Sequence, residues 1–223
     1  MKKNMRFLNR KNMQRVASAL LTLVLLFGII PAAPIESAEA ASWMDEYIDK
    51  AVEWGVMRGD VSGNLNAEGK ITRAEFVTMV NRAFGYSAST THPFEDVRLS
   101  DWYNNDIGIA YNMGYFKGTG ETTASPNSYL TREQAVVLIG RNLLLNEKLG
   151  EALGFSDSRT FSSWSRGMIE SAIDAGYVSG YSDGSFLPQK NVSRGEVAAM
   201  LVKAIGTMVN KPGTHTLGGV YGN

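Results

Sequence analysis

Residues 71–75 read Ile-Thr-Arg-Ala-Glu, and related stretches follow at 130–134, Leu-Thr-Arg-Glu-Gln, and at 192–196, Val-Ser-Arg-Gly-Glu. Each stretch stands at the same distance from an upstream tryptophan. Counted from Trp43, Trp102 and Trp164, further columns agree without a gap: Ile48, Ile107 and Ile169; Ala51, Ala110 and Ala172; Gly55, Gly114 and Gly176; Gly59, Gly118 and Gly180. Agreement at a fixed spacing indicates three copies of one structural unit.

Each unit has the pattern of a helix, a loop and a second helix. The isoleucine and alanine columns give the first helix one apolar face, and a glycine cap ends it. Apolar residues at helical spacing follow in the second, for example Phe76, Met79 and Val80. A unit of ~40 residues is too small to bury these faces alone. We therefore expect an all-α fold, with three helix-loop-helix repeats in a pseudo-threefold arrangement around a central three-helix bundle. A linear solenoid is the alternative.

The second helix of each repeat begins with a capping box. In this motif a hydroxyl accepts the backbone N–H three residues on, and the side chain at that position reaches back to the cap N–H. The pairs are Thr72 with Glu75, Thr131 with Gln134, and Ser193 with Glu196. These six residues are predicted to be structural.

Capping does not explain the arginine that follows each cap. A cation is unfavourable at the first position of a helix, where the dipole is positive. Free N–H groups and a guanidinium together suit a carboxylate or phosphate. The sequence thus predicts anion-binding residues, namely Arg73, Arg132 and Arg194. The alternative is a salt bridge between repeats, with Asp45, Asp101 or other nearby acids as partners.

Two further columns have alternative interpretations. Trp43, Trp102 and Trp164 lie on an apolar stripe, which favours the core, but a tryptophan at a groove rim would stack on a sugar. The glycines at 59, 118 and 180 are chiefly conformational and would also let a ligand approach the backbone.

Composition excludes several classes of protein. The 223 residues include no cysteine and only two histidines, and the formal charge is zero. A Cys/His zinc site and a cysteine nucleophile are therefore excluded, and nothing in the charge suggests nucleic acid. The hydrophobic share of 44% is enough for a folded core.

The first 40 residues are predicted to be a secretory signal peptide. A basic start precedes an apolar run over 16–30, and Ala38-Glu39-Ala40 is a small-x-small cleavage site. A membrane anchor is the alternative, but the run is shorter than the ~20 residues of a span. Export would leave a mildly acidic chain that meets the membrane only in transit. We expect repeats at 41–86, 94–146 and 155–207 and a flexible tail at 208–223.

The repeat resembles the S-layer homology (SLH) domain of bacterial cell-surface proteins. Thr72-Arg73-Ala74-Glu75 matches its Thr-Arg-Ala-Glu motif, Phe94-Glu95-Asp96 and Phe155-Ser156-Asp157 match its Phe-x-Asp opening, and 180–188 matches its middle. The resemblance implies a pseudo-trimer that binds an anionic, pyruvylated secondary cell wall polysaccharide between repeats, with the motif arginine contacting the charge. It also implies a protein that is secreted, attached to the cell wall or surface layer, and able to anchor a cargo protein, with no cofactor or metal.

Departures from the motif affect what the resemblance implies. Copy two has Gln134 for the motif glutamate, and copy one lacks Phe-x-Asp, which would loosen its first helix. We therefore rank the sites of Arg73 and Arg194 above that of Arg132. Asp183-Gly184-Ser185 resembles part of a calcium loop, so a cation-binding or protein-docking module is the alternative function. A glycan hydrolase needs paired carboxylates, and no such pair recurs in the copies, so no enzyme is expected.

Overall fold

The computed structural model describes residues 36–88, 91–150 and 153–209. The chain divides into two compact units, Met1–Glu39 and Ala40–Asn223. Of the first unit, only residues 36–39 are described, at the start of helix α2. Most of the predicted signal peptide and of the predicted tail therefore lies outside the described residues. The predicted cleavage position, Ala40, lies within α2.

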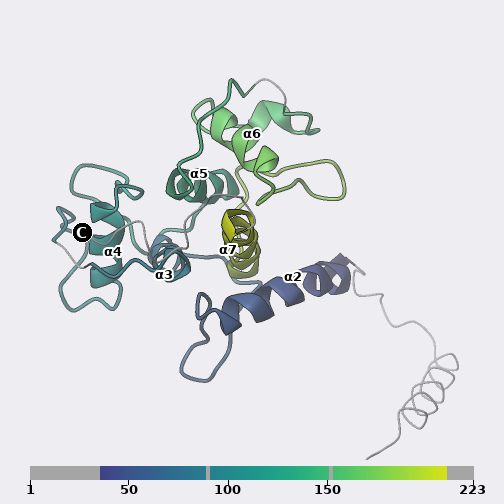
Figure 1. Ribbon diagram of the computed structural model, residues 1–223. Coiled ribbons are helices and arrows are strands. Elements are labelled where there is room, and N and C mark those ends of the chain that lie inside the picture. Colours follow the sequence, from purple (N-terminus) through teal and green to yellow (C-terminus); the bar gives the residue numbers. More distant parts are fainter. Residues whose placement is uncertain (1–35, 89–90, 151–152, 210–223) are drawn as a thin grey trace, which may run out of the picture. The chain divides into compact units, whose positions relative to one another are not determined.

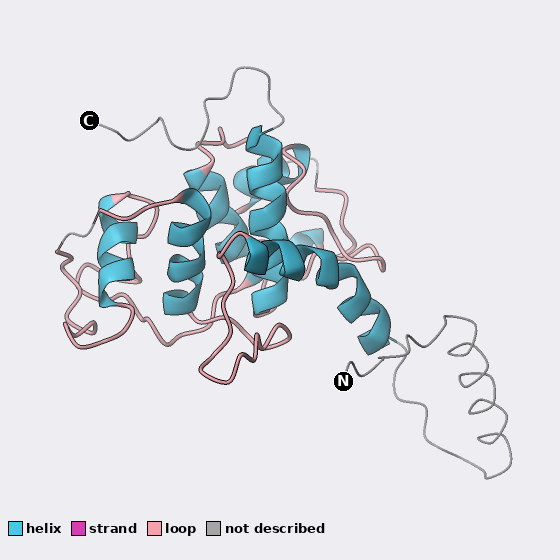
Figure 2. Ribbon diagram, turned by 60° about the horizontal axis from the view of Figure 1, so that its bottom comes forward, coloured by secondary structure: helices cyan, strands magenta, loops and turns pink. Residues whose placement is uncertain are grey.

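The described residues form α-helices and loops, so the all-α fold class is confirmed. The elements are α2 (Glu36–Glu53), α3 (Arg73–Phe84), α4 (Asn104–Asn112), α5 (Arg132–Asn142), the 3₁₀ helix η2 (Ser158–Thr160), α6 (Arg166–Asp174) and α7 (Arg194–Val209). Figure 2 shows long loops between these helices and no strand.

The second helices of the repeats, α3, α5 and α7, lie together at the centre of the second unit, and the first helices surround them (Figure 1). The inner helices α3 and α5 both pack on α7. The outer helix α4 packs on α3, and α6 packs on α5. Each of these outer helices therefore covers the inner helix of the preceding repeat.

The first repeat completes this arrangement through its contact with the third. The ammonium of Lys203 on α7 lies 4.9 Å from the ring centroid of Tyr47 on α2. A Cβ on Gly195 of α7 would lie 3.1 Å from the sulfur of Met44, which is buried. Residues of α2 thus contact α7, and the loosening expected from the missing Phe-x-Asp opening stays a prediction.

A closed ring of backbone hydrogen bonds joins the residues just before the inner helices. Ile71 donates its N–H to Val192, Val192 donates to Leu130, and Leu130 donates to Ile71, with N···O distances of 3.1, 3.0 and 3.3 Å. A linear solenoid would leave its end repeats unpaired. The ring therefore distinguishes the pseudo-threefold arrangement from the solenoid.

The isoleucines and alanines that recur in the three repeats form the core, as the periodicity predicts. All three isoleucines and all three alanines of the outer helices are buried. The glycines at the ends of these helices have φ angles of 70°, 78° and 80° at Gly55, Gly114 and Gly176. Only the left-handed region gives such angles, which is why glycine recurs there.

Candidate ligand site at the repeat interfaces

The capping boxes form in all three repeats. Thr72 accepts from the N–H of Glu75, and Glu75 Oε2 accepts from the N–H of Thr72 at 2.8 Å. The pairs Thr131–Gln134 and Ser193–Glu196 make the same reciprocal bonds. The structural role predicted for these residues is consistent with their geometry.

The N–H groups beside the motif arginines are not free, which corrects the expectation for this helix start. The backbone N–H of each arginine donates to a carbonyl of the following repeat in the cyclic order: Arg73 to Ser128 at 2.9 Å, Arg132 to Lys190 at 2.8 Å and Arg194 to Gly69 at 2.9 Å. The next N–H in each helix is paired in the same way, with Pro126, Pro188 and Ala67. Any anion must therefore be held by side chains.

The arginine side chains also reach into the loop of the following repeat. Arg73 Nε donates to the Ala124 carbonyl at 2.8 Å, and Arg132 Nη2 donates to that of Ser179 at 2.7 Å. Arg194 donates to the carbonyls of Leu65 and Arg58. Arg73 and Arg132 are 7% and 6% exposed. The three guanidinium groups thus link each repeat to the next, and the partners expected from the sequence, Asp45 and Asp101, are not used.

Opposite each arginine stands a capping-box residue of the following repeat, and at two of the three positions that residue is a glutamate. Arg194 Nη1 lies 3.0 Å from Glu75 Oε1, and Arg132 Nη1 lies 3.7 Å from Glu196 Oε1. The corresponding residue for Arg73 is the neutral Gln134. Accordingly, Arg73 has no ion pair within the described chain, and burial lowers its pKa, an effect that Asp96 partly offsets. We call these contacts the 1/2 interface (Arg73, Gln134), the 2/3 interface (Arg132, Glu196) and the 3/1 interface (Arg194, Glu75).

The terminal nitrogens of Arg73 remain in contact with solvent. They make no hydrogen bond within the described chain. Among the described residues, Arg132 Nε is the one buried side-chain polar atom without a partner, so the unpaired terminal nitrogens of Arg73 are not buried. The guanidinium carbon of Arg73 lies over the ring of Phe116, 4.6 Å from its centroid. Arg73 therefore offers unpaired N–H donors on a guanidinium whose position is fixed by Phe116 and Ala124.

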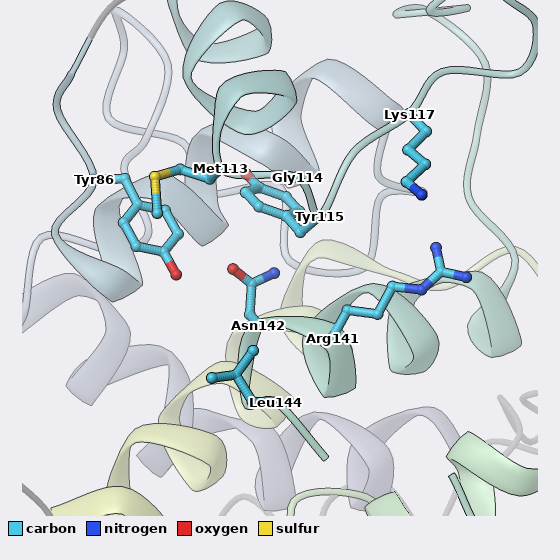
Figure 3. Close-up of a pocket in the computed structure, with 8 residues that line it drawn as sticks. All are labelled: Tyr86, Met113, Gly114, Tyr115, Lys117, Arg141, Asn142 and Leu144. Atoms are coloured by element: carbon cyan, nitrogen blue, oxygen red, sulfur yellow. The ribbon is translucent and has the colours of Figure 1, made fainter. Parts of the chain in front are cut away.

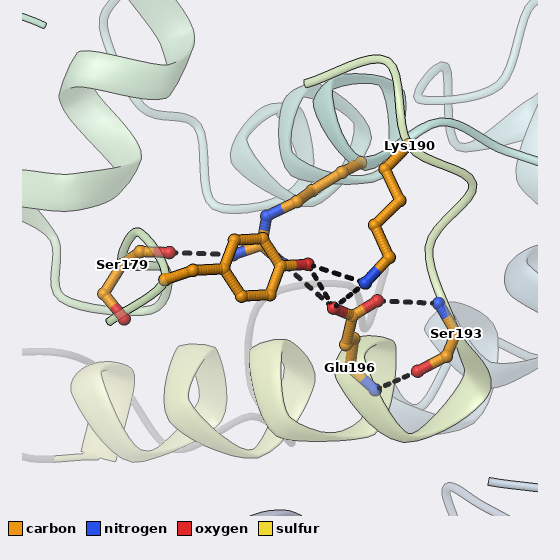
Figure 4. A network of polar contacts seen from close by, with 6 residues as sticks. Ser179, Lys190, Ser193 and Glu196 are labelled. Carbon is orange, nitrogen blue, oxygen red and sulfur yellow. Dashed lines mark hydrogen bonds and ion pairs between the residues drawn. The ribbon is translucent and has the colours of Figure 1, made fainter. Parts of the chain in front are cut away.

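The 2/3 interface instead contains a closed polar network (Figure 4). Glu196 accepts hydrogen bonds from the Tyr181 hydroxyl and the Ser193 N–H, and Lys190 Nζ lies 3.4 Å from its Oε1. Burial by itself would raise the pKa of Glu196, but the bonds from Tyr181 and Ser193 and the charges of Arg132 and Lys190 outweigh it and lower that pKa. The carboxylate is thus held ionised next to Arg132.

The three repeat tryptophans lie at the surface and not in the core. Trp43, Trp102 and Trp164 are 45%, 63% and 50% exposed. Trp102 and Trp164 precede α4 and α6, so the stripe of those helices does not include them. In the part of the chain that the structure describes, no cation–π contact joins one of these rings to a motif arginine, because Arg73 and Arg132 lie over other rings.

At the glycines proposed to admit a ligand, other atoms of the protein occupy the space beside the backbone. A Cβ on Gly118 would lie 2.4 Å from the Thr123 oxygen, and one on Gly180 would lie 2.4 Å from the Phe155 ring. A Cβ on Gly59 would lie 2.6 Å from the backbone of Gly63. Close packing of each repeat's own loop therefore explains these glycines.

Two kinds of structural residue were not identified from the sequence. Asp96 accepts from the N–H groups of Ala124 and Ser125, and Asp157 from those of Phe186 and Leu187, so the Phe-x-Asp aspartates fix the loops that the arginines contact. Their recurrence was the available signal. Glu133 is 2% exposed and accepts bonds from Ser162, Ser165 and Gln189. It replaces Ala74 and Gly195 of the other copies, and that departure could have drawn attention to it.

Comparison with known proteins identifies the family of the repeats. The model of the S-layer homology domain matches residues 37–77, 93–136 and 154–198. Each range contains an outer helix and the start of an inner helix.

Several similar proteins carry a related segment. An amylopullulanase of Thermoanaerobacterium thermosulfurigenes is 31% identical over 165 residues, 72% of this chain and 9% of that protein. A surface-layer 125 kDa protein of Lysinibacillus sphaericus is 30% identical over 172 residues, 77% of this chain and 14% of that protein. A cell surface protein of Thermoanaerobacter kivui is 25% identical over 206 residues, 87% of this chain and 25% of that protein. The chain thus spans a quarter or less of the length of these relatives.

The described residues contain no helix that is both long and apolar enough to span a bilayer. The triplicated helix-loop-helix unit, its capping boxes and the three matched ranges agree with one another. The chain belongs to the S-layer homology domain family.

Proposed function

We propose that this chain is a non-catalytic module that anchors a protein to the bacterial cell wall by binding an anionic, pyruvylated polysaccharide, chiefly at the 1/2 interface. The observation that carries the proposal is the side chain of Arg73, a residue that is 7% exposed and has no ion pair in the described chain.

A buried cation without a partner is unfavourable, and a carboxylate from a ligand relieves that cost. Guanidinium and carboxylate groups form paired hydrogen bonds that are shorter and stronger than neutral ones. Gln134 adds to this preference. Its Oε1 accepts from the N–H of Thr131 at 3.0 Å, so its amide N–H₂ group is left as a further donor. The interface therefore favours an anion, such as the carboxylate of a pyruvate ketal.

The other two interfaces offer less to an anion, because Glu75 and Glu196 already occupy the space beside Arg194 and Arg132. This reverses part of the ranking from sequence, which assigned the weakening effect of Gln134 to the Arg132 site and placed Arg194 beside Arg73. Weak binding at these sites would still help, because several contacts along one polymer raise avidity ~10²–10⁴-fold when the geometry permits. The exposed tryptophans are proposed as stacking surfaces for its sugars.

The relatives support an anchoring role. They include surface-layer and cell surface proteins, and they also include an amylopullulanase of which this chain matches 9%. A segment shared by proteins with such different names is better explained by attachment than by catalysis. We accordingly propose a secreted protein held at the wall or surface layer, with a cargo protein as a further partner and no cofactor.

The test is cosedimentation of the protein with isolated cell walls. Gln134→Glu keeps the capping box and Arg73 but adds a carboxylate, so we expect binding to fall about 10–100-fold, the equivalent of a charge-assisted hydrogen bond of about 1.5–3 kcal/mol. Wall binding by the Arg73→Gln variant should fall by at least the same factor. Arg98→Ala, which removes an exposed charge elsewhere, is the control.

Thermal unfolding of each variant checks that the fold is retained. The unmodified protein should bind weakly to walls from which the acidic ketal has been removed. Its binding to those walls should be no stronger than the binding of the Gln134→Glu variant to intact walls. Undiminished sedimentation of folded Gln134→Glu would exclude the 1/2 interface as the anion site.

A calcium-binding alternative receives little support from the loop that suggested it. Asp183 Oδ1 accepts from the N–H and the hydroxyl of Ser185 at 2.8 and 2.7 Å, which is the pattern of a turn. Among the described residues, no group of three or more acidic or histidine side chains is arranged to hold a metal ion. Calorimetry with calcium distinguishes the two functions.

A further inference from the structure

A second candidate site lies at the other end of the central helices. A pocket of about 270 Å³ is formed by the end of α4 and the residues that follow it, the end of α5, and Tyr86 (Figure 3). Its walls are Tyr86, Met113, Gly114, Tyr115, Lys117, Arg141, Asn142 and Leu144. Ligand pockets usually measure ~300–1,000 Å³, so this one suits a group of the size of a single sugar residue.

The pocket is positively charged. Lys117 and Arg141 lie on the same side of it (Figure 3), and both side chains are exposed. Neither makes a hydrogen bond or an ion pair within the described chain, and no acidic residue lines the pocket. Two neighbouring cations repel each other, and a bound anion would relieve that repulsion.

The opposite wall combines an amide with aromatic rings. Asn142 occupies the position of the buried Ala83 and Ala204 in the other repeats, so it is a polar residue at an otherwise apolar site. Its Nδ2 donates to the Leu138 carbonyl at 2.9 Å, which leaves Oδ1 as an acceptor. Tyr86 is packed against Phe84 and Tyr115, with ring centroids 5.8 and 6.2 Å away.

The equivalent positions in the third repeat lack this chemistry. Ser179 replaces Lys117, and Lys203, which replaces Arg141, lies over the ring of Tyr47. The first repeat has two cations at these positions, Arg58 and Arg82, but Ala83 stands in place of the amide. Two cations beside an amide acceptor are therefore particular to the second repeat within the described chain.

We propose that this pocket binds an acidic sugar residue, with its carboxylate at Lys117 and Arg141, a hydroxyl donating to Asn142, and its apolar face against Tyr86. An inorganic anion has no apolar face to pack on an aromatic ring and no hydroxyl to donate to the amide oxygen, so the lining of the pocket favours a sugar acid.

The pocket also extends the 1/2 interface. Gln134 and Arg141 are seven residues apart on α5, which places them on one side of the helix and ~10 Å apart along its axis. A polymer held at Arg73 would reach the pocket along that side. This link depends on the proposed function, whereas sugar-acid binding does not.

The experiment is an NMR titration of the ¹⁵N-labelled protein with D-glucuronate, followed at the Asn142 side-chain amide and the Gly114 backbone N–H. We expect saturable shifts with glucuronate, and shifts at least tenfold smaller with D-glucose or with inorganic sulfate. Lys117→Ala/Arg141→Ala should weaken glucuronate binding at least tenfold. Arg98→Ala/Arg159→Ala removes two exposed charges elsewhere and should leave it unchanged.

Equal shifts with sulfate, no saturable shift, or unchanged binding by the Lys117/Arg141 variant would overturn the proposal. The variant Arg73→Gln separates the two sites. It should lose wall binding and keep the glucuronate shifts at Asn142. Loss of wall binding by Gln134→Glu with intact glucuronate binding supports both proposals, whereas wall binding that survives Gln134→Glu contradicts only the proposed function.

Discussion

The 1/2 and 2/3 interfaces have the same backbone hydrogen bonds and opposite electrostatic character. At both, an arginine that follows the helix cap reaches into the loop of the next repeat. At the 2/3 interface Glu196 faces that arginine, whereas Gln134 occupies the corresponding position at the 1/2 interface. A single residue in the neighbouring repeat thus decides whether the arginine is an internal link or is open to a ligand.

The largest expected effect concerns the stability of the 2/3 interface. Glu133→Ala removes a buried carboxylate that accepts hydrogen bonds from Ser162, Ser165 and Gln189. Leaving buried polar groups unpaired costs about 1–3 kcal/mol each, so we expect a loss of about 3 kcal/mol in the free energy of unfolding. Urea unfolding measures it.

At the 1/2 interface Ala74 stands in place of Glu133, so the control variant is taken from an exposed glutamate near that interface. Glu95→Ala, at an exposed glutamate, should change the free energy of unfolding by less than about 0.5 kcal/mol. Equal losses for Glu133→Ala and Glu95→Ala would show that the buried carboxylate does not hold the 2/3 interface.

The next effect concerns binding at the 3/1 interface. Glu75→Gln gives this interface the composition of the 1/2 interface, and Gln134 shows that glutamine still completes the capping box. Arg194 would lose its carboxylate partner, and we expect binding of wall polymer to rise about tenfold, equivalent to about 1.4 kcal/mol. Calorimetry with purified polymer measures this change. Weaker or unchanged binding by a folded variant would argue against charge compensation as the difference between the interfaces.

A smaller effect is expected on the acid sensitivity of the 2/3 interface. The pKa of Glu196 is lowered below 4.5 in the fold, so its carboxylate stabilises the protein above pH 4.5. This contribution disappears as the pH falls through the lowered pKa. Glu196→Gln should therefore make stability depend less on pH below 4.5, as measured by urea unfolding across a pH series. Gln134→Ala, which removes no titrating group, should leave the pH dependence as it is.

The smallest effect is expected at the exposed tryptophans. Trp102→Ala should change the free energy of unfolding by less than about 1 kcal/mol, because the side chain is 63% exposed. A loss of about 3–5 kcal/mol, typical of a core tryptophan, would contradict the surface position. Wall binding by the same variant tests whether the ring contacts the polymer.

Residues whose partners are close in sequence were predicted well. The capping boxes, the glycine caps and the buried isoleucines all depend on neighbours within a few residues, and each has the predicted geometry. The apolar stripe favoured a core position for the tryptophans, but all three are exposed, and the outer helices begin after Trp102 and Trp164. The N–H groups at the inner helix starts were expected to be free because their acceptors belong to another repeat.

The sequence by itself determined the number of repeats, their helical content and the ends of their helices, because these follow from local spacing and backbone preference. The tertiary structure decided which residue faces each motif arginine. Closing the ring sets every arginine against the capping residue of the following repeat, so that Gln134 acts on Arg73 and not on Arg132. Electrostatic interaction depends on distance in space, and that distance was established only when the three repeats closed on one another.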